Sequence, residues 1–220
     1  TCRVCGSGDL VKVLDLGTMP LANAFVAKDS LHVPELTFPL AINFCNACFL
    51  VQLTHVVDAE VIFNKDYYYA TSASKPLVEH FRALADEIAN DFVHAPQDLV
   101  VEIGSNDGSL LNRIKDRTRV LGVDPAENMT KIAIASGVPT RVGYFGTALA
   151  QDIHKEVGAA TVVVANNVMA HIDDIRDVFQ GVSDLLAPNG TFIFEVHWVG
   201  NLVGDGGFDQ IYHEHLYYYS

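Results

Sequence analysis

The sequence has 220 residues, of which 50% are apolar and 19% are charged, so it can build a sizeable core and is not globally disordered. Its 27 Asp and Glu outnumber its 14 Lys and Arg, and the net charge of −13 argues against a nucleic-acid-binding protein. There is neither an apolar run of about 18 residues, as a membrane span requires, nor a signal-peptide pattern. We therefore expect a monomeric cytoplasmic protein of one or two domains, with no membrane partner.

All four cysteines lie in two C-x-x-C pairs, Cys2 with Cys5 and Cys45 with Cys48. Two such turns supply the four thiolates of a tetrahedral Zn²⁺ site. Four thiolates leave no open position on the metal, so the predicted zinc is structural. Disulfides or free thiols are the alternative, and disulfides would need an oxidising compartment. The pattern predicts a small zinc-binding domain over residues 1–60.

From Lys75 onward, helical and strand patterns alternate, which predicts an α/β fold with a parallel, doubly wound sheet. The first helix of this part is amphipathic, with apolar residues at intervals of three and four between Leu77 and Ala89. The five expected strands are Leu99–Ile103, Val120–Asp124, Val138–Val142, Thr161–Ala165 and Thr191–Val196. The helices between them are expected over residues 109–115, 129–136, 147–156 and 173–186.

The turn after the first strand of this sheet carries a cofactor signal. Its pattern, Glu102-x-Gly104-x-Asn106-x-Gly108, differs from the G-x-G-x-x-G of dinucleotide folds, because Asn106 replaces the middle glycine. Glycines at such a turn let a ligand approach the backbone. Asp124 ends the next strand, where a carboxylate accepts hydrogen bonds from the ribose of an adenosine; a helix cap is the alternative.

Glu102 indicates which adenosine cofactor fits. An inward carboxylate would repel a pyrophosphate but suits an ammonium group, which favours S-adenosylmethionine over NAD. Asn166 and Asn167 follow the fourth strand, and ligands of α/β sheets bind at the carboxyl ends of strands. We therefore place both in the same cofactor pocket, with a helix cap as the alternative.

Four proton-active side chains stand in a row near the end of the sequence, Tyr212, His213, Glu214 and His215. In an extended segment Tyr212 and Glu214 would share one face and the two histidines the other, but a turn or a helix start is also open. Histidine is the usual proton acceptor near neutral pH, so the segment predicts general-base chemistry. A metal site and a structural cluster are the alternatives. His171, taken alone, fits a satisfied histidine better than a functional one.

Together these motifs resemble the family of sugar C-methyltransferases that make C-3-branched deoxysugars on nucleotide carriers. The resemblance covers the whole chain, and its most specific part is the stretch from Phe208 to His215. The other matching parts are both C-x-x-C pairs, the Leu-Gly-x-x-Pro-Leu-Ala-Asn-Ala-Phe run from Leu16 to Phe25, and residues 101–108 and 166–171.

The resemblance implies a Rossmann-like class I methyltransferase core over residues 61–220, behind the zinc-binding domain. It also implies a C-terminal domain that helps to hold the nucleotide sugar. We expect that domain to be absent, since the sequence is truncated after the fifth of seven core strands. By resemblance, His215 is the base, and Tyr212, Glu214 and His171 surround the sugar. Tyr67, in a cluster of three tyrosines, would contact the sugar, with interdomain packing as the alternative.

The expected reaction is S-adenosylmethionine-dependent methylation at C-3 of a nucleotide-linked 4-keto-deoxysugar. The C-3 proton is α to the ketone, so a base can remove it and leave an enolate that attacks the methyl group. One alternative is a nicotinamide-dependent sugar-modifying enzyme, which would need the missing G-x-G-x-x-G. The other is a non-catalytic module, in which a zinc ribbon and a degenerate α/β domain serve an interaction.

Overall fold

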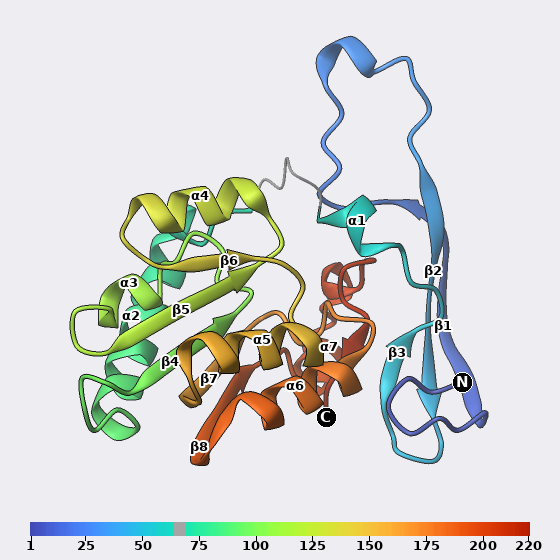
Figure 1. Cartoon of the computed structure of the whole chain (residues 1–220). Coiled ribbons are helices and arrows are strands. Elements are labelled where there is room, and N and C mark those ends of the chain that lie inside the picture. The colour runs from blue at the N-terminus through green and yellow to red at the C-terminus, as the bar shows by residue number, and fades with distance from the viewer. Residues whose placement is uncertain (64–68) are drawn as a thin grey trace. The chain divides into compact units, whose positions relative to one another are not determined.

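The computed structural model describes residues 1–63 and 69–220, and the chain folds as two compact units, which we describe separately (Figure 1). The first unit combines Thr1–Asn64, Met169–Ile175 and Val196–Ser220. The second combines Lys65–Val168 and Arg176–Glu195. The chain therefore passes between the units several times, whereas the sequence predicted one boundary at residue 60.

The first unit is built on an antiparallel sheet with the strand order β1-β2-β3-β9. The first strand continues through Gly17 to Pro20, because this stretch pairs with the second strand through register shifts. Its strands are β1 (Leu10–Pro20), β2 (Thr37–Cys45), β3 (Val51–Leu53) and β9 (Tyr217–Tyr218). Its helices are α1 (Ala59–Ile62) and α7 (Val199–Gly204), with single 3-10 turns at Lys28–Ser30 and Phe208–Gln210.

Hydrogen bonds explain why the last residues belong to the first unit. Strand β9 pairs with β3, and the backbone N–H of Leu53 donates to the carbonyl of Leu216 over 2.9 Å. The N–H of Leu216 in turn donates to the carbonyl of Ala170 over 2.7 Å. Tyr217 and Tyr218 are fully buried, so this short strand also adds two large rings to the core.

The second unit contains the predicted parallel sheet, with all five expected strands in the order β6-β5-β4-β7-β8. The strands are β4 (Leu99–Ile103), β5 (Arg119–Asp124), β6 (Thr140–Val142), β7 (Ala160–Asn166) and β8 (Leu186–Glu195). The helices are α2 (Lys75–Asp91), α3 (Leu111–Ile114), α4 (Glu127–Ala135), α5 (Thr147–Val157) and α6 (Ile175–Leu185), and a 3-10 turn covers Thr71–Ala73. The doubly wound α/β prediction is therefore confirmed.

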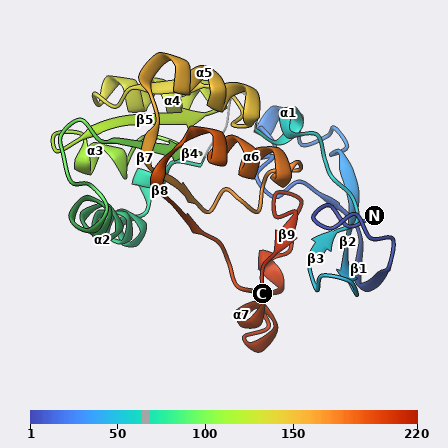
Figure 2. The same cartoon turned by 60° about the horizontal axis from the view of Figure 1, so that its bottom comes forward.

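Helices cover both faces of this sheet, with α2 on one side and α5 and α6 on the other in both views (Figures 1 and 2). The predicted apolar stripe of α2 buries Phe81, Ala85 and Ile88 against Val100 and Val162 of the sheet. Because side chains alternate along a strand, the neighbouring strand residues face the opposite layer. The sheet is thus buried on both faces, and ligands can reach it only at its ends.

Among the described residues, no helix combines the length and the apolar character that crossing a membrane requires.

Candidate functional site

The four cysteines lie on two turns of the same backbone geometry. In the first turn, the N–H of Gly6 donates to the carbonyl of Cys2 over 2.9 Å. In the second, the N–H of Phe49 donates to the carbonyl of Cys45 over 2.8 Å. The residue after each C-x-x-C is left-handed, with φ of 76° at Gly6 and 65° at Phe49. Each turn therefore presents two thiols in the same way, as the repeated spacing predicted.

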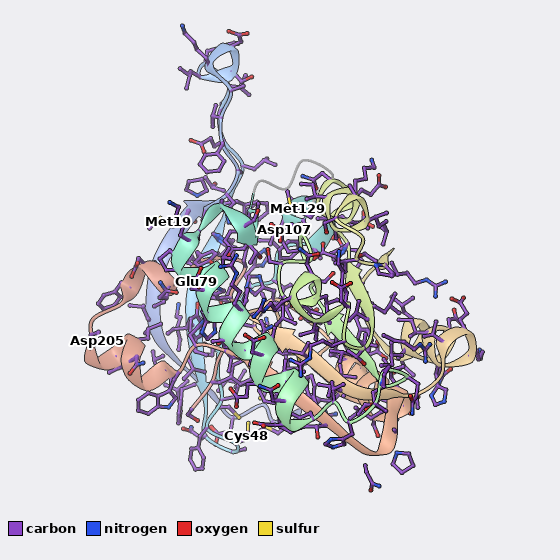
Figure 3. The ribbon with its side chains drawn as sticks, turned by 90° about the vertical axis from the view of Figure 1, so that its left-hand side faces the viewer. Met19, Cys48, Glu79, Asp107, Met129 and Asp205 are labelled. Atoms are coloured by element: carbon purple, nitrogen blue, oxygen red, sulfur yellow. The ribbon has the colours of Figure 1, made fainter. Side chains whose placement is uncertain are left out.

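The four sulfur atoms form one cluster, within 4.8 Å of one another (Cys48 is labelled in Figure 3). The Sγ atoms of Cys2 and Cys48 are 3.6 Å apart, as are those of Cys5 and Cys45. Zn–S bonds of about 2.3 Å in a tetrahedron separate the sulfurs by roughly 3.8 Å, whereas a disulfide needs about 2.05 Å. Burial raises the pKa of Cys2, but backbone N–H groups of Cys5 and Val4 and the thiols of Cys48 and Cys5 together lower it to about 7, which favours the thiolate. The cluster fits zinc, and the disulfide alternative is wrong.

In the second unit, the glycine-rich turn after β4 has a left-handed backbone at three positions. Gly104, Asn106 and Gly108 all have positive φ, at 67°, 50° and 77°. A Cβ added to Gly104 would lie 2.8 Å from Cγ2 of Val168, so no larger residue fits there without displacing its neighbour. The turn lies at the carboxyl end of β4, the end of a parallel sheet at which ligands bind.

Asp124 ties this turn to the end of β5. Its Oδ2 accepts a hydrogen bond from the N–H of Asn106, and its Oδ1 accepts one from the N–H of Ala126, each over 2.8 Å. The bond to Ala126 supports the alternative role of Asp124 as a helix cap, because α4 begins directly after Ala126. Each carboxylate oxygen still has a second acceptor site, so the same side chain can also receive ribose hydroxyls.

Glu102 is a fully buried carboxyl group at the same end of the sheet. Burial raises its pKa well above the ordinary 4.5; the amide of Asn166 opposes this, and the charges of Asp124 and Asp107 add to it. Its Oε1 lies 3.5 Å from the Asn166 amide, and its Oε2 has no hydrogen-bond partner among the described residues. Ser105 Oγ and Asn166 Oδ1 are also buried without a hydrogen-bond partner among the described residues. The unpaired Oε2 of Glu102, with the Asn166 side chain beside the same carboxyl, fits the ammonium group of S-adenosylmethionine.

The side chain of Asn106 is used elsewhere in the second unit. Its Oδ1 accepts from the N–H of Thr71 over 2.9 Å, and its amide donates to the carbonyl of Tyr69 over 3.0 Å. Asp107, labelled in Figure 3, accepts from the N–H of Ser72 over 2.8 Å. The turn therefore holds residues 69–72, and both the side chain and the N–H of Asn106 are engaged within the chain.

Asn167 also has a local partner. It has a positive φ of 54°, and its amide donates to a carboxylate oxygen of Glu195 over 2.7 Å. Asn166 stays beside Glu102, so the structure separates the two asparagines that the sequence grouped together.

In the first unit, residues 212–215 form a turn, one of the conformations that the sequence left open. The N–H of His215 donates to the carbonyl of Tyr212 over 3.1 Å. The turn brings the Tyr212 hydroxyl to 2.9 Å from Nε2 of His215. The two side chains therefore do not point to opposite faces, as they would in an extended segment. His213 instead contacts the carbonyl of Phe38 over 3.2 Å, which gives it a structural partner.

The hydrogen bonds of His215 define its tautomer. Its Nδ1 is 2.8 Å from the carbonyl of Gln210, which can only accept, so Nδ1 carries the hydrogen. Nε2 then has the free electron pair and accepts from Tyr212. Burial and the neighbouring His197 lower the pKa of His215 to about 4, so the ring is neutral at pH 7.

Two further predicted residues join this cluster. The rings of His171 and His215 lie 5.0 Å apart between centroids, and His171 Nδ1 is 3.8 Å from Oε2 of Glu214. Burial lowers the pKa of His171 to about 3 and raises that of Glu214. The Glu214 Oε1 accepts from the amide of Asn23 over 2.5 Å. The four predicted catalytic side chains are therefore brought together, while Tyr67 lies outside the described residues.

The sequence analysis missed Asn23 and His197. His197 follows β8 by two residues, so the rule that selected Asn166 at the end of β7 could have selected it. Asn23 offered no signal beyond its place in the Leu16–Phe25 run.

Two family models match the chain. One, described as "Putative zinc binding domain", matches residues 2–63, and the other, described as "Methyltransferase domain", matches residues 78–220. The chain belongs to the methyltransferase-domain family. Its four-cysteine cluster lies inside the zinc-binding match, which confirms the predicted zinc-binding domain.

One curated protein similar to this chain is the C-methyltransferase NovU of Streptomyces niveus, which is 38% identical over 220 residues. The match covers 100% of this chain and 52% of NovU, so the chain spans about half the length of the curated relative it matches.

Solved structures share the fold of this methyltransferase-family chain. One is a chain of the complex between the Haloferax volcanii Trm112 methyltransferase activator and a methyltransferase, with a TM-score of 0.52, 17% identity and coverage of 76% of this chain and 72% of that one. Another is the YcgJ protein of Bacillus subtilis, with a TM-score of 0.51, 16% identity and coverage of 64% and 63%. Together with the family match, they confirm the Rossmann-like methyltransferase core, a fold whose cofactor is S-adenosylmethionine.

Proposed function

We propose that the protein containing this chain transfers a methyl group from S-adenosylmethionine to C-3 of a nucleotide-linked 4-keto-deoxysugar. The proposal rests chiefly on the pair formed by the half-buried Tyr212 and the buried His215, in which a hydroxyl donates to a neutral imidazole over 2.9 Å. The 38% identity to a C-methyltransferase supports carbon as the acceptor.

The pair gives a route for the proton. The Tyr212 oxygen takes the proton from the carbon α to the ketone, while its own hydroxyl proton moves to Nε2 of His215. The electrons of the C–H bond become the enolate, whose oxygen carries the charge. A buried imidazole with a pKa of about 4 is a weak base, but the enolate's negative charge nearby raises that pKa during the reaction.

The other residues of the first unit hold this pair. Glu214 is fixed by Asn23 and places its carboxyl group beside His171. Bound S-adenosylmethionine supplies an electrophilic methyl group to the carbanion. In the second unit, Glu102 would bind the ammonium group of the cofactor and Asp124 its ribose hydroxyls. The backbone of the Gly104–Gly108 turn would pack against the cofactor.

Solvent exchange tests the base without the methyl donor. The protein containing this chain is incubated in D₂O with a nucleotide-linked 4-keto-6-deoxyhexose, and NMR locates the deuterium. We expect exchange at C-3, slowed about 10²–10⁴-fold by His215→Asn. The control is His94→Asn, which removes an exposed histidine of the second unit.

The outcomes separate the parts of the proposal. Exchange at C-5 alone, which is also α to the ketone, would overturn the C-3 assignment. Parent-rate exchange in His215→Asn but not in Glu214→Gln would make Glu214 the base. No exchange or methylation with any keto-sugar would refute the function.

A further inference from the structure

The histidine cluster of the first unit contains a residue that the proposed reaction does not use. The ring centroid of His197 lies 4.0 Å from that of His215, with 50° between the ring planes. The Tyr212 ring lies at 4.1 Å from the same imidazole, with 46° between the planes. The His215 ring thus contacts two other rings while its two nitrogens are held by hydrogen bonds.

Packing alone does not explain a histidine at this position. The Nε2 of His197 is buried and has no hydrogen-bond partner within the described part of the chain. A buried polar atom without a partner costs about 1–3 kcal/mol, so an apolar ring of similar shape would pack at lower cost. What imidazole adds is the capacity to take up a proton beside His215.

We propose that His197 is a positioning residue for the base: its ring fixes the imidazole of His215, and its own protonation in acid keeps His215 unprotonated. This inference rests on the proposed function, because His215 must be neutral to accept a proton. Two imidazolium rings at 4.0 Å would repel each other strongly, so the pair takes up one proton before two.

The other groups around His215 do not replace this role. His171 meets it edge-on at 5.0 Å and is almost completely buried, which lowers its pKa to about 3 and keeps it neutral. Tyr212 donates a hydrogen bond, and Tyr218 faces Tyr212 with a pKa that burial raises. The Glu214 carboxyl is held by Asn23. His197 is only half-buried, so burial lowers its pKa less, and it accepts the first proton.

Two variants of His197 separate packing from charge. His197→Phe keeps a ring against His215 but cannot be protonated, whereas His197→Ala removes both. The pH profile of C-3 deuterium exchange and of methylation is measured for each in the protein containing this chain. Circular dichroism and S-adenosylhomocysteine affinity check that the fold is kept, and His94→Asn is the control.

We expect His197→Phe to keep the plateau rate within about twofold and to shift the acidic limb upward by about half to one pH unit. His197→Ala should lower the plateau about tenfold, because the base loses its support. If both variants keep the acidic limb and the plateau rate of the parent pH profile, the inference is overturned. Equal plateau losses in both would also overturn it, since the nitrogen would then be needed for another purpose.

An NMR titration of ¹³C-labelled histidines, without substrate, separates this inference from the proposed function. The His215 signal, identified by its loss in His215→Asn, should titrate at higher pH in His197→Phe than in the parent. If that shift is seen in a protein without activity on any keto-sugar, the coupling of the two rings stands and the proposed function fails. If the signal is unmoved in an active protein, the positioning role fails alone.

Discussion

Replacing Glu102 by glutamine should raise the stability of the cofactor-free protein and weaken its affinity for the cofactor. The carboxyl group is fully buried, and its Oε2 meets no partner among the described residues. Glutamine keeps the shape and removes the charge. The two effects have opposite signs because the carboxylate costs free energy when the protein is empty and gains a cation when the cofactor binds.

The pH dependence follows from the raised pKa of Glu102. Below the pKa of the unfolded chain, near 4.3, both folded and unfolded states are protonated and the burial of the group carries no charge penalty. Stability is lost as the pH rises from there to the raised folded-state pKa, since the unfolded carboxyl ionises in water while the buried one stays protonated. The gain from Glu102→Gln should therefore be small at pH 5 and larger at pH 8.

The magnitudes follow from general values. A gain on the order of 1 kcal/mol in the free energy of unfolding would raise the Tm by roughly 2–4 °C at pH 8. Loss of a charged hydrogen bond to the cofactor ammonium costs about 1.5–3 kcal/mol, or roughly 10- to 150-fold in affinity for S-adenosylhomocysteine.

Thermal unfolding at both pH values and calorimetry with S-adenosylhomocysteine measure the two effects. The matched control is Glu79→Gln, on the exposed side of α2 (labelled in Figure 3), which should change neither. A lower Tm at pH 8 together with parent affinity would refute the reasoning, because Glu102 would then be satisfied within the chain.

Three other predictions concern the two sites. Metal analysis of protein purified without added zinc should find about one zinc per chain, and Cys48→Ser should lower that content and the Tm; full thermal stability in a zinc-free protein would contradict a structural role. Asp124→Ala should weaken S-adenosylhomocysteine binding about 10- to 100-fold in calorimetry, since the ribose loses a charged acceptor, and unchanged affinity in a folded variant would remove Asp124 from the site. Phe49→Gly should raise the unfolding free energy by about 1 kcal/mol, because Phe49 is exposed and has a left-handed φ of 65°, whereas Gly6→Ala at the equivalent position should lower it; the opposite order in denaturant titrations would refute the comparison.

Local sequence patterns determined most of the second unit. The interval of three and four in α2, the apolar run of β4 and the polar residue that ends β5 each depend on neighbours in the chain, so their positions were predictable. The cysteine cluster was predictable for a related reason, since each C-x-x-C turn builds its own geometry and the metal needs both turns.

Tertiary structure alone decided how the first unit is assembled. Pairing of β9 with β3 joins the last residues to the zinc-binding sheet, and the bond from Asn23 to Glu214 spans 191 positions. The contact of His197 with His215 depends on the turn at 212–215, which the sequence left undecided. No local periodicity encodes such contacts, because their free energy comes from burial and hydrogen bonds between distant segments and appears only when the chain has closed the loops between them.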